Sequence, residues 1–147
     1  RTYGFEATAT WQVTERWRLQ PTYSMLQMDF YARPDNSYTD NRSVAEVEGS
    51  SPQNQFSLRS SLDLPHGVTF DTALRYVDNL PYFNIDSYFE LNARLAWQIN
   101  KNLEISLVGQ NLLHNRHAEF GPTVINTQNG MVSEIPRSFY AQLTWRF

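Results

Sequence analysis

The stretch "FYAQLTWRF", residues 139–147, alternates apolar and polar residues up to its last position. The apolar series consists of Phe139, Ala141, Leu143, Trp145 and Phe147. A period of two places these residues on one face of a β-strand and the intervening residues on the other. Most domains end instead in a few polar, loosely held residues. This stretch therefore predicts a terminal strand that is itself part of the structure, with one dry face and one wet face.

The composition narrows the classes of protein that this chain can represent. It has 147 residues, a formal net charge of -3 and an isoelectric point of about 5.5. No basic excess is available to neutralise phosphates, so nucleic acid is not an expected partner. Cysteine is absent, which excludes disulfides and cysteine-based zinc or redox motifs. The mean hydropathy of -0.53 is compatible with a membrane barrel, whose strands alternate between lipid-facing and lumen-facing residues.

The period-two pattern recurs upstream and predicts seven antiparallel strands. We expect them at about residues 3–13, 17–31, 54–64, 68–80, 87–99, 103–113 and 137–147. Pro21 falls inside the second run, where a bulge could accommodate it because proline cannot donate to a ladder. The connections alternate between short (14–16, 65–67, 100–102) and long (32–52, 80–86, 114–136). Short turns on one rim and long loops on the other are typical of bacterial outer-membrane barrels.

The residue types on the two faces favour a membrane barrel over a soluble β-sandwich, which is the alternative reading of the same alternation. Aromatic residues make up 14% of the chain and cluster beside the short turns, as in an interfacial girdle. The polar face is almost free of lysine, since Lys101 is the only one, and this suits a lumen better than an open surface. Residues expected to face lipid or its interface are Trp11, Trp17, Phe56, Leu58, Leu95, Trp97 and Phe139.

Three stretches resemble one known family. They are "SPQNQFSLRSSLDLPHG" (51–67), "ISLVGQNLLHNRHAEFG" (105–121) and "EIPRSFYAQLTWRF" (134–147). In order and spacing they resemble the C-terminal barrel region of TonB-dependent outer-membrane receptors. The expected fold class is thus all-β, an antiparallel up-and-down transmembrane β-barrel segment of about seven strands. The resemblance implies a larger barrel of about 22 strands with a plugged lumen. The plug, and the segment that contacts TonB, are expected outside this sequence.

The resemblance also implies a function and a location. The parent protein would take up a siderophore-type metal chelate or another large nutrient across the outer membrane of a Gram-negative bacterium, energised through TonB. It would contact outer-membrane lipid, the TonB complex and the barrel assembly machinery. A passive porin or adhesin-like barrel remains the main alternative, and an outer-membrane enzyme is a third. No GxSxG, P-loop or HExxH motif is present, so neither a catalytic residue nor a cofactor is expected.

The last strand further resembles the C-terminal signal that the assembly machinery reads. This implies a signal formed by Tyr140, Leu143, Trp145 and Phe147. Gln142 stands where the pattern prefers glycine, so the match is incomplete. We expect a polar tail after Phe147, or its replacement by aspartate, to impair assembly of the parent protein.

Among the remaining polar residues, none specifies a ligand. His114 and His117 form an H-x-x-H stretch, but without further ligands this is weak evidence for metal, and no metal site is expected. Centring the hairpin on residues 65–67 puts Asp71 opposite Ser61 and diagonal to Arg59, which predicts an Arg59–Asp71 pair on the lumen wall. Five arginines are expected to point inward, where they could attract anionic chelates or pair with carboxylates: Arg18, Arg59, Arg75, Arg94 and Arg146.

Overall fold

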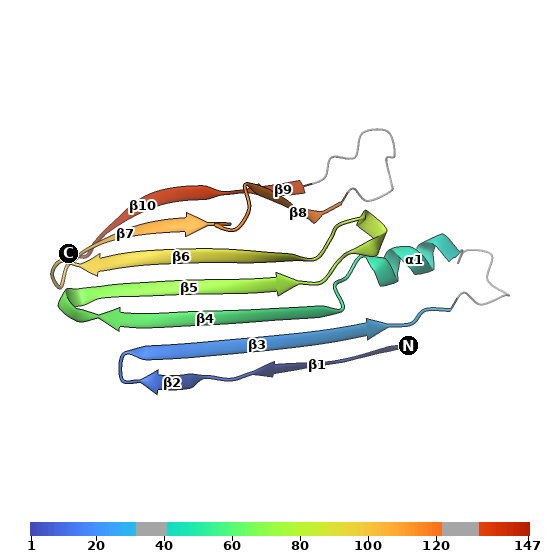
Figure 1. Ribbon diagram of the computed structural model, residues 1–147, viewed down its shortest axis with the longest axis horizontal. Coiled ribbons are helices and arrows are strands. Elements are labelled where there is room, and N and C mark those ends of the chain that lie inside the picture. The colour runs from blue at the N-terminus through green and yellow to red at the C-terminus, as the bar shows by residue number, and fades with distance from the viewer. Residues whose placement is uncertain (32–40, 122–132) are drawn as a thin grey trace.

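The computed structural model describes residues 1–31, 41–121 and 133–147 and shows one curved antiparallel sheet (Figure 1). The strands of this sheet are β1 (Thr2–Thr8), β2 (Trp11–Thr14), β3 (Trp17–Met28), β4 (Asn54–Leu64), β5 (Val68–Val77), β6 (Tyr88–Gln98), β7 (Leu103–Gln110) and β10 (Ser138–Trp145). Their order is β1-β3-β4-β5-β6-β7-β10, and β2 pairs with β3. Apart from β1 and β2, which both pair with β3, successive strands of this sheet are neighbours, and the sheet has two open edges. The predicted fold class is confirmed.

The first expected strand, residues 3–13, is in fact broken into β1 and β2. The break at residues 9–10 lies opposite Pro21, whose carbonyl accepts a hydrogen bond from the Ala9 N–H at 3.1 Å. In an antiparallel ladder the N–H of residue 21 would point to the same side, but proline has none. Pro21 itself remains inside the continuous strand β3. The irregularity that proline predicts thus falls on the partner strand instead.

The structure agrees with the expected strand at 54–64, which is β4, and shortens most of the others. Each of the other observed strands is one to three residues shorter than expected at one or both of its ends. This holds for the expected runs 17–31, 68–80, 87–99, 103–113 and 137–147. The expected long loops contain regular structure, which is a correction. They hold α1 (Asn41–Gly49), η2 (Pro81–Phe83), and a second sheet of β8 (Arg116–Phe120) and β9 (Ser133–Pro136). None of the described helices is long and apolar enough to cross a membrane.

The short connections all lie at one end of the sheet, at the left in Figure 1. Between β4 and β5 the turn η1 (Pro65–Gly67) places His66 and Gly67 at positive φ, 64° and 74°. Between β6 and β7 the side-chain Oδ1 of Asn100 accepts hydrogen bonds from the N–H groups of Asn102 (2.9 Å) and Leu103 (3.0 Å). Such local side-chain bonds stabilise tight turns. The helix and the β8–β9 hairpin lie at the opposite end, which we call the loop rim.

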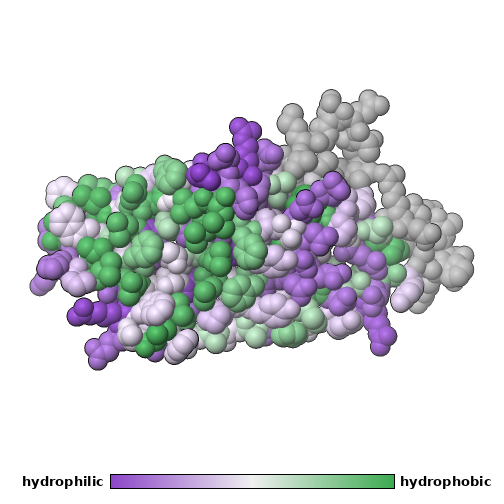
Figure 2. All heavy atoms as spheres, viewed as in Figure 1, coloured by the Kyte–Doolittle hydropathy of each residue, from purple (hydrophilic) through white to green (hydrophobic). Residues whose placement is uncertain are grey.

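Strand register sorts the side chains into apolar and polar rows. One apolar row runs through Tyr23, Phe56, Tyr76 and Phe89 on four successive strands. The rings of Tyr76 and Phe89 lie 4.9 Å apart. A second apolar row, nearer the short turns, joins Leu62, Phe70, Leu95 and Leu107. In Figure 2, apolar surface gathers over the strands, and hydrophilic surface predominates toward the loop rim. We call the apolar side the outer face and the opposite side the inner wall.

Most of the buried side chains among the described residues belong to the loop rim, whereas Ala96 and Ser106 are buried within the sheet. Val77, Leu80 and Ile85 are the buried aliphatic residues there, and Leu80 and Ile85 form a short bridge with each other. Asn111 and His117 are buried polar residues in the same region. The open sheet buries little on either face, so this small core holds the long connections against the strand ends. It also fixes the polar groups described next.

Candidate functional site

The inner wall carries three polar rows, each a direct consequence of strand register. The first joins Arg18, Ser61, Asp71 and Arg94 across β3, β4, β5 and β6. The second joins Gln20, Arg59, Ala73 and Asn92. The third, closest to the loop rim, joins Ser57, Arg75 and Glu90. Because alternate residues of a strand share a face, a polar series along each strand becomes a continuous polar wall.

The first row holds an ion-pair cluster centred on Arg94. Its guanidinium contacts Asp71 at 3.2 Å and Glu104 at 2.5 Å. The hydroxyl of Ser61 donates a 2.6 Å hydrogen bond to the other oxygen of Asp71. Asp71 does lie opposite Ser61, but the expected Arg59–Asp71 pair is wrong. Arg94 is directly opposite Asp71 whereas Arg59 is only diagonal to it, and directly opposed side chains are the closer pair.

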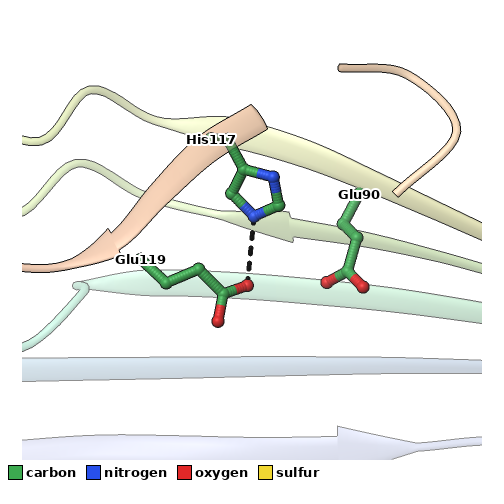
Figure 3. A group of neighbouring side chains, drawn as sticks. All are labelled: Glu90, His117 and Glu119. Carbon is green, nitrogen blue, oxygen red and sulfur yellow. Dashed lines mark hydrogen bonds and ion pairs between the residues drawn. The ribbon is translucent and has the colours of Figure 1, made fainter. Parts of the chain in front are cut away.

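A second cluster lies at the loop rim around Arg75 (Figure 3 shows its acidic and imidazole members). Arg75 forms an ion pair with Glu90 on the neighbouring strand at 2.9 Å and another with Glu119 on β8. Glu119 also contacts Nε2 of His117 at 3.1 Å. Charge-assisted hydrogen bonds of this kind are stronger than neutral ones. The cluster therefore ties the β8–β9 hairpin to the inner wall.

The aromatic ring of Tyr88 completes this cluster. Its centroid lies 4.4 Å from that of His117, and Arg75 lies 5.7 Å above the same ring. The Tyr88 hydroxyl accepts a 3.3 Å hydrogen bond from Arg75. The side chain of His117 is only 7% exposed as a result. Stacking and cation–π contacts both favour this arrangement.

The oxygens and nitrogen of Glu90, His117 and Glu119 lie within 4.8 Å of one another, a grouping that could in principle ligate a metal ion. However, Arg75 already bonds both carboxylates, so a cation between them would have to overcome its positive charge. The H-x-x-H stretch does not form a site either: the rings of His114 and His117 are 6.0 Å apart, and His114 lies outside this grouping. The geometry favours an ion-pair network.

Asn111 is a structural residue that the sequence reasoning did not single out. It is fully buried and adopts a positive φ of 50°. Its N–H donates to the side-chain oxygen of Asn92 at 2.9 Å, and its Nδ2 donates to the carbonyl of Ile135 at 2.8 Å. Asn111 thereby joins the inner wall, the end of β7 and the β8–β9 hairpin. Its place in the "GQNLL" stretch was the available signal, as "AEFG" was for Glu119.

The first two polar rows also enclose a recess of about 300 Å³. Its lining includes Arg18, Gln20, Arg59, Ala73 and Val108. In contrast to Arg75 and Arg94, Arg18 and Arg59 form no ion pair with any residue that the structure describes. Among the described residues, the wall therefore contains two arginines that are paired with carboxylates and two that are not. Arg146, the fifth expected inward arginine, lies beyond the end of β10.

The residues expected to face lipid lie on the outer face. Trp11, Trp17, Leu95, Trp97 and Phe139 are exposed, with Phe139 65% accessible. Phe56 and Leu58 are half-buried within the apolar rows. Contact of these residues with lipid remains a prediction.

The four residues of the expected assembly signal are divided between the two faces. Leu143 and Trp145 are on the outer face, opposite Ile105 and Leu103 of β7. Tyr140 is opposite Val108 on the inner wall, and Phe147 follows the end of the strand. Their role in assembly remains a prediction.

Several solved structures have a similar fold, and three of them are receptors for a siderophore, a ferric catecholate and ferric yersiniabactin. The ferric-catecholate import receptor Fiu from Escherichia coli K12 superposes with a TM-score of 0.72 at 21% identity, covering 99% of this chain and 21% of that one. The siderophore receptor PiuA from Acinetobacter baumannii gives 0.70 at 18% identity, covering 97% and 21%. The ferric yersiniabactin uptake receptor FyuA from Yersinia pestis gives 0.72 at 19% identity, covering 99% and 23%.

These similarities, at under a quarter identity, establish the fold. This chain spans about a fifth of the length of the solved receptors. Family membership comes from the sequence itself, since residues 1–112 match the family described as TonB dependent receptor-like, beta-barrel. That match covers most of the chain and agrees with the meander, the apolar outer face and the polar inner wall. The chain therefore belongs to the TonB-dependent receptor β-barrel family and represents part of such a receptor.

Proposed function

We propose that this chain forms part of the wall of an outer-membrane active-transport receptor, which takes up a siderophore-type metal chelate or another large nutrient using energy supplied through TonB. The observation that carries the proposal is the family match over residues 1–112. The names of the similar structures support the ligand class, because they are receptors for a ferric catecholate, a siderophore and ferric yersiniabactin.

In this proposal the two faces of the sheet have different roles. The outer face, with exposed Trp97, Leu107 and Phe139, would contact lipid, as outward apolar bands do in transmembrane barrels. The inner wall, with its ion-pair clusters, would line the lumen. The long connections at the loop rim would lie outside the cell, because bacterial barrels have short turns on the periplasmic side. Loops on a rigid scaffold commonly bind ligands, so this rim is where a chelate would first be met.

Uptake of radiolabelled ferric siderophores by cells that express the complete receptor tests the function. We expect accumulation in cells with functional TonB and loss of it in an otherwise identical strain without TonB. Equal accumulation with and without TonB would contradict active transport and indicate the passive channel instead.

Membrane location needs its own measurement. We expect the complete receptor to fractionate with the outer membrane and to show heat-dependent migration on a denaturing gel, as folded β-barrels resist unfolding until boiled. Recovery of the complete protein in a soluble fraction would contradict the barrel. These two experiments separate the location of the protein from its transport activity.

A further inference from the structure

The turn η2 lies between two longer connections of the loop rim and contacts both. Figure 1 shows it, in yellow-green, beside α1. A Cβ added at Gly49, the last residue of α1, would lie 2.8 Å from the backbone nitrogen of Tyr82. A Cβ added at Gly121, one residue beyond β8, would lie 2.5 Å from the Cβ of Phe83. A side chain at either position would overlap with η2, so both contacts leave no free space.

The backbone of η2 is braced on both sides. The flanking residues Leu80 and Ile85 form a bridge in which the N–H of each donates to the carbonyl of the other, at 2.9 and 3.2 Å. Inside it, Asn84 has a φ of 53° and its N–H donates to the carbonyl of Pro81. Proline fixes its own φ. Because Leu80 and Ile85 are also buried, we expect η2 to move as one body.

The adjacent rings of Tyr82 and Phe83 connect the two glycine contacts. Their centroids lie 5.3 Å apart and their planes are inclined by 75°, which is an edge-to-face arrangement. Closely packed groups transmit a displacement because they have little free volume to absorb it. A shift of the chain at Gly121 against Phe83 should therefore displace Tyr82, and with it the end of α1 at Gly49.

The helix α1 should respond measurably to such a displacement. It is held by its contact with η2 and by a hydrogen bond of 2.6 Å from the Phe30 N–H to Glu48. Its second half alternates between half-buried and exposed residues. Segments that bury few apolar contacts open locally at low free energy. The exchange rates of the α1 amides therefore report on the position of η2.

We propose that η2 couples α1 to the β8–β9 hairpin, so that displacing either segment loosens the other and fixing either segment orders the other. The coupling is reciprocal, because it is one free energy shared by both segments. A partner or solute that contacts one of these connections would then act on both. The inference goes beyond the proposed function, since it concerns how the loop rim moves and holds for any transported solute.

Hydrogen exchange measured by mass spectrometry on the complete receptor in detergent tests the coupling. Gly121→Ala inserts a Cβ against Phe83. We expect the amides of residues 41–49 to exchange about fivefold faster, which is the lower end of typical coupling between sites. Gly49→Ala should have the same effect on residues 116–120. Unchanged exchange of α1 in the Gly121→Ala receptor would overturn the proposal.

Two controls separate coupling from general loosening. Arg116→Gln removes an exposed ion pair with Glu134 on the same hairpin, which contributes little, so α1 should exchange as in the wild type. The amides of residues 57–64, in β4 toward the short turns, should not respond to Gly121→Ala. Equal acceleration of these amides and of α1 would indicate general unfolding and would overturn the coupling inferred from that variant.

A milder variant keeps the proposal testable if Gly121→Ala does not fold. Glu119→Gln loosens the hairpin by removing its ion pair with Arg75 and leaves η2 unchanged. We expect residues 116–120 and 41–49 both to exchange faster in this receptor. Faster exchange of the hairpin alone would overturn the proposal.

A double-mutant cycle tests whether η2 carries the coupling. Phe83→Gly removes the three atoms that lie nearest to a Cβ at position 121. Gly121→Ala added to Phe83→Gly should therefore no longer accelerate α1. Additive effects of the two substitutions would route the coupling around η2 and overturn the proposal. Failure of the coupling leaves TonB-dependent uptake intact. Coupled exchange in a receptor whose uptake does not require TonB would support the role of η2 while contradicting the proposed transport.

Discussion

Arg75 on β5 forms an ion pair with Glu119 on β8, a residue 44 positions further along the chain. This contact connects the middle of the sheet to the hairpin at the loop rim. Arg75 also bonds Glu90, so its removal would leave two carboxylates facing each other. The hairpin is therefore held by charge in addition to its own backbone ladder.

Replacing Arg75 with glutamine should loosen the β8–β9 hairpin. Because Arg75 is 40% exposed, we expect a cost of about 1 kcal/mol rather than the full value of a buried pair. Hydrogen exchange of the amides of residues 116–120 should accelerate in the complete receptor. Arg94→Gln is the matched control, since Arg94 also bonds two carboxylates but none on β8. Equal acceleration in both variants would show that the hairpin responds to general loss of wall charge.

Asn111→Ala should be more disruptive than its small change in size suggests. It leaves the Ile135 carbonyl without its donor and places alanine at a positive φ. Because this bond is only part-buried, its loss should cost about 1 kcal/mol, to which the strained backbone of alanine adds. We expect a lower midpoint in guanidinium unfolding of the receptor in detergent. Asn111→Gly keeps the backbone freedom and removes only the side-chain bonds, so it should fall between Asn111→Ala and the wild type. Wild-type stability for both variants would contradict the assigned role.

The strands followed from alternation because each strand exposes its two faces to two different environments. The alternation also predicted the polar residues of the inner wall, and together with the turn at residues 65–67 it predicted that Asp71 lies opposite Ser61. The alternation could not predict which arginine pairs with Asp71. That pairing depends on the register of β6 against β5, and no short turn fixes this register. The connection between those strands is long, and only the structure shows that Arg94 lies directly opposite.

The loop rim was the part that local pattern could not predict. Helix α1 lies in a stretch rich in Asp, Asn and Ser that reads as loop, and its contacts are with η2 rather than with a continuous core. Likewise, "RHAEF" does not alternate between apolar and polar residues, so the sequence did not predict strand β8. In the structure its His117 and Glu119 contact Tyr88 and Arg75, which lie about 30 to 45 positions earlier in the chain. Contacts between distant segments decide this region, and no local pattern encodes them.

Substitutions at two adjacent residues of the turn η1 should have opposite consequences for stability. Gly67 has φ of 74°, and a Cβ there would lie 2.8 Å from the backbone carbonyl of Gln98, so Gly67→Val should destabilise by about 2 kcal/mol or more. His66 already adopts φ of 64° with a side chain, so His66→Gly should change stability little. Unfolding in detergent measures both. A larger loss for His66→Gly would contradict the backbone argument.

The outer and inner faces should respond differently to the same charge. Leu95→Lys places an ammonium on the outer face within β6. A lipid-facing lysine costs about 2–4 kcal/mol at the bilayer midplane and less toward the interfaces, so we expect a clear loss below that maximum. Thr69→Lys places the ammonium on the inner wall near Asp63, where it should be tolerated. The fraction of receptor with heat-dependent migration compares the two in cells. Equal loss for both variants would contradict the assignment of faces.

Substitutions of Phe147 should distinguish an effect on assembly in cells from an effect on the stability of the folded receptor. The backbone is held up to Arg146, whose N–H donates to the Asn102 carbonyl at 2.8 Å and whose carbonyl accepts from the Asn102 side chain at 2.6 Å. Phe147 beyond it is fully exposed. Phe147→Asp, or a polar tail after it, should therefore leave refolding of purified receptor in detergent unchanged.

In cells the same variant should reduce the folded, heat-modifiable receptor in the outer membrane, because we expect the assembly machinery to read this side chain. Arg146→Gln, which keeps both backbone contacts, is the control. Normal assembly of the aspartate variant would contradict the signal, whereas parallel loss in detergent and in cells would assign Phe147 a structural role instead.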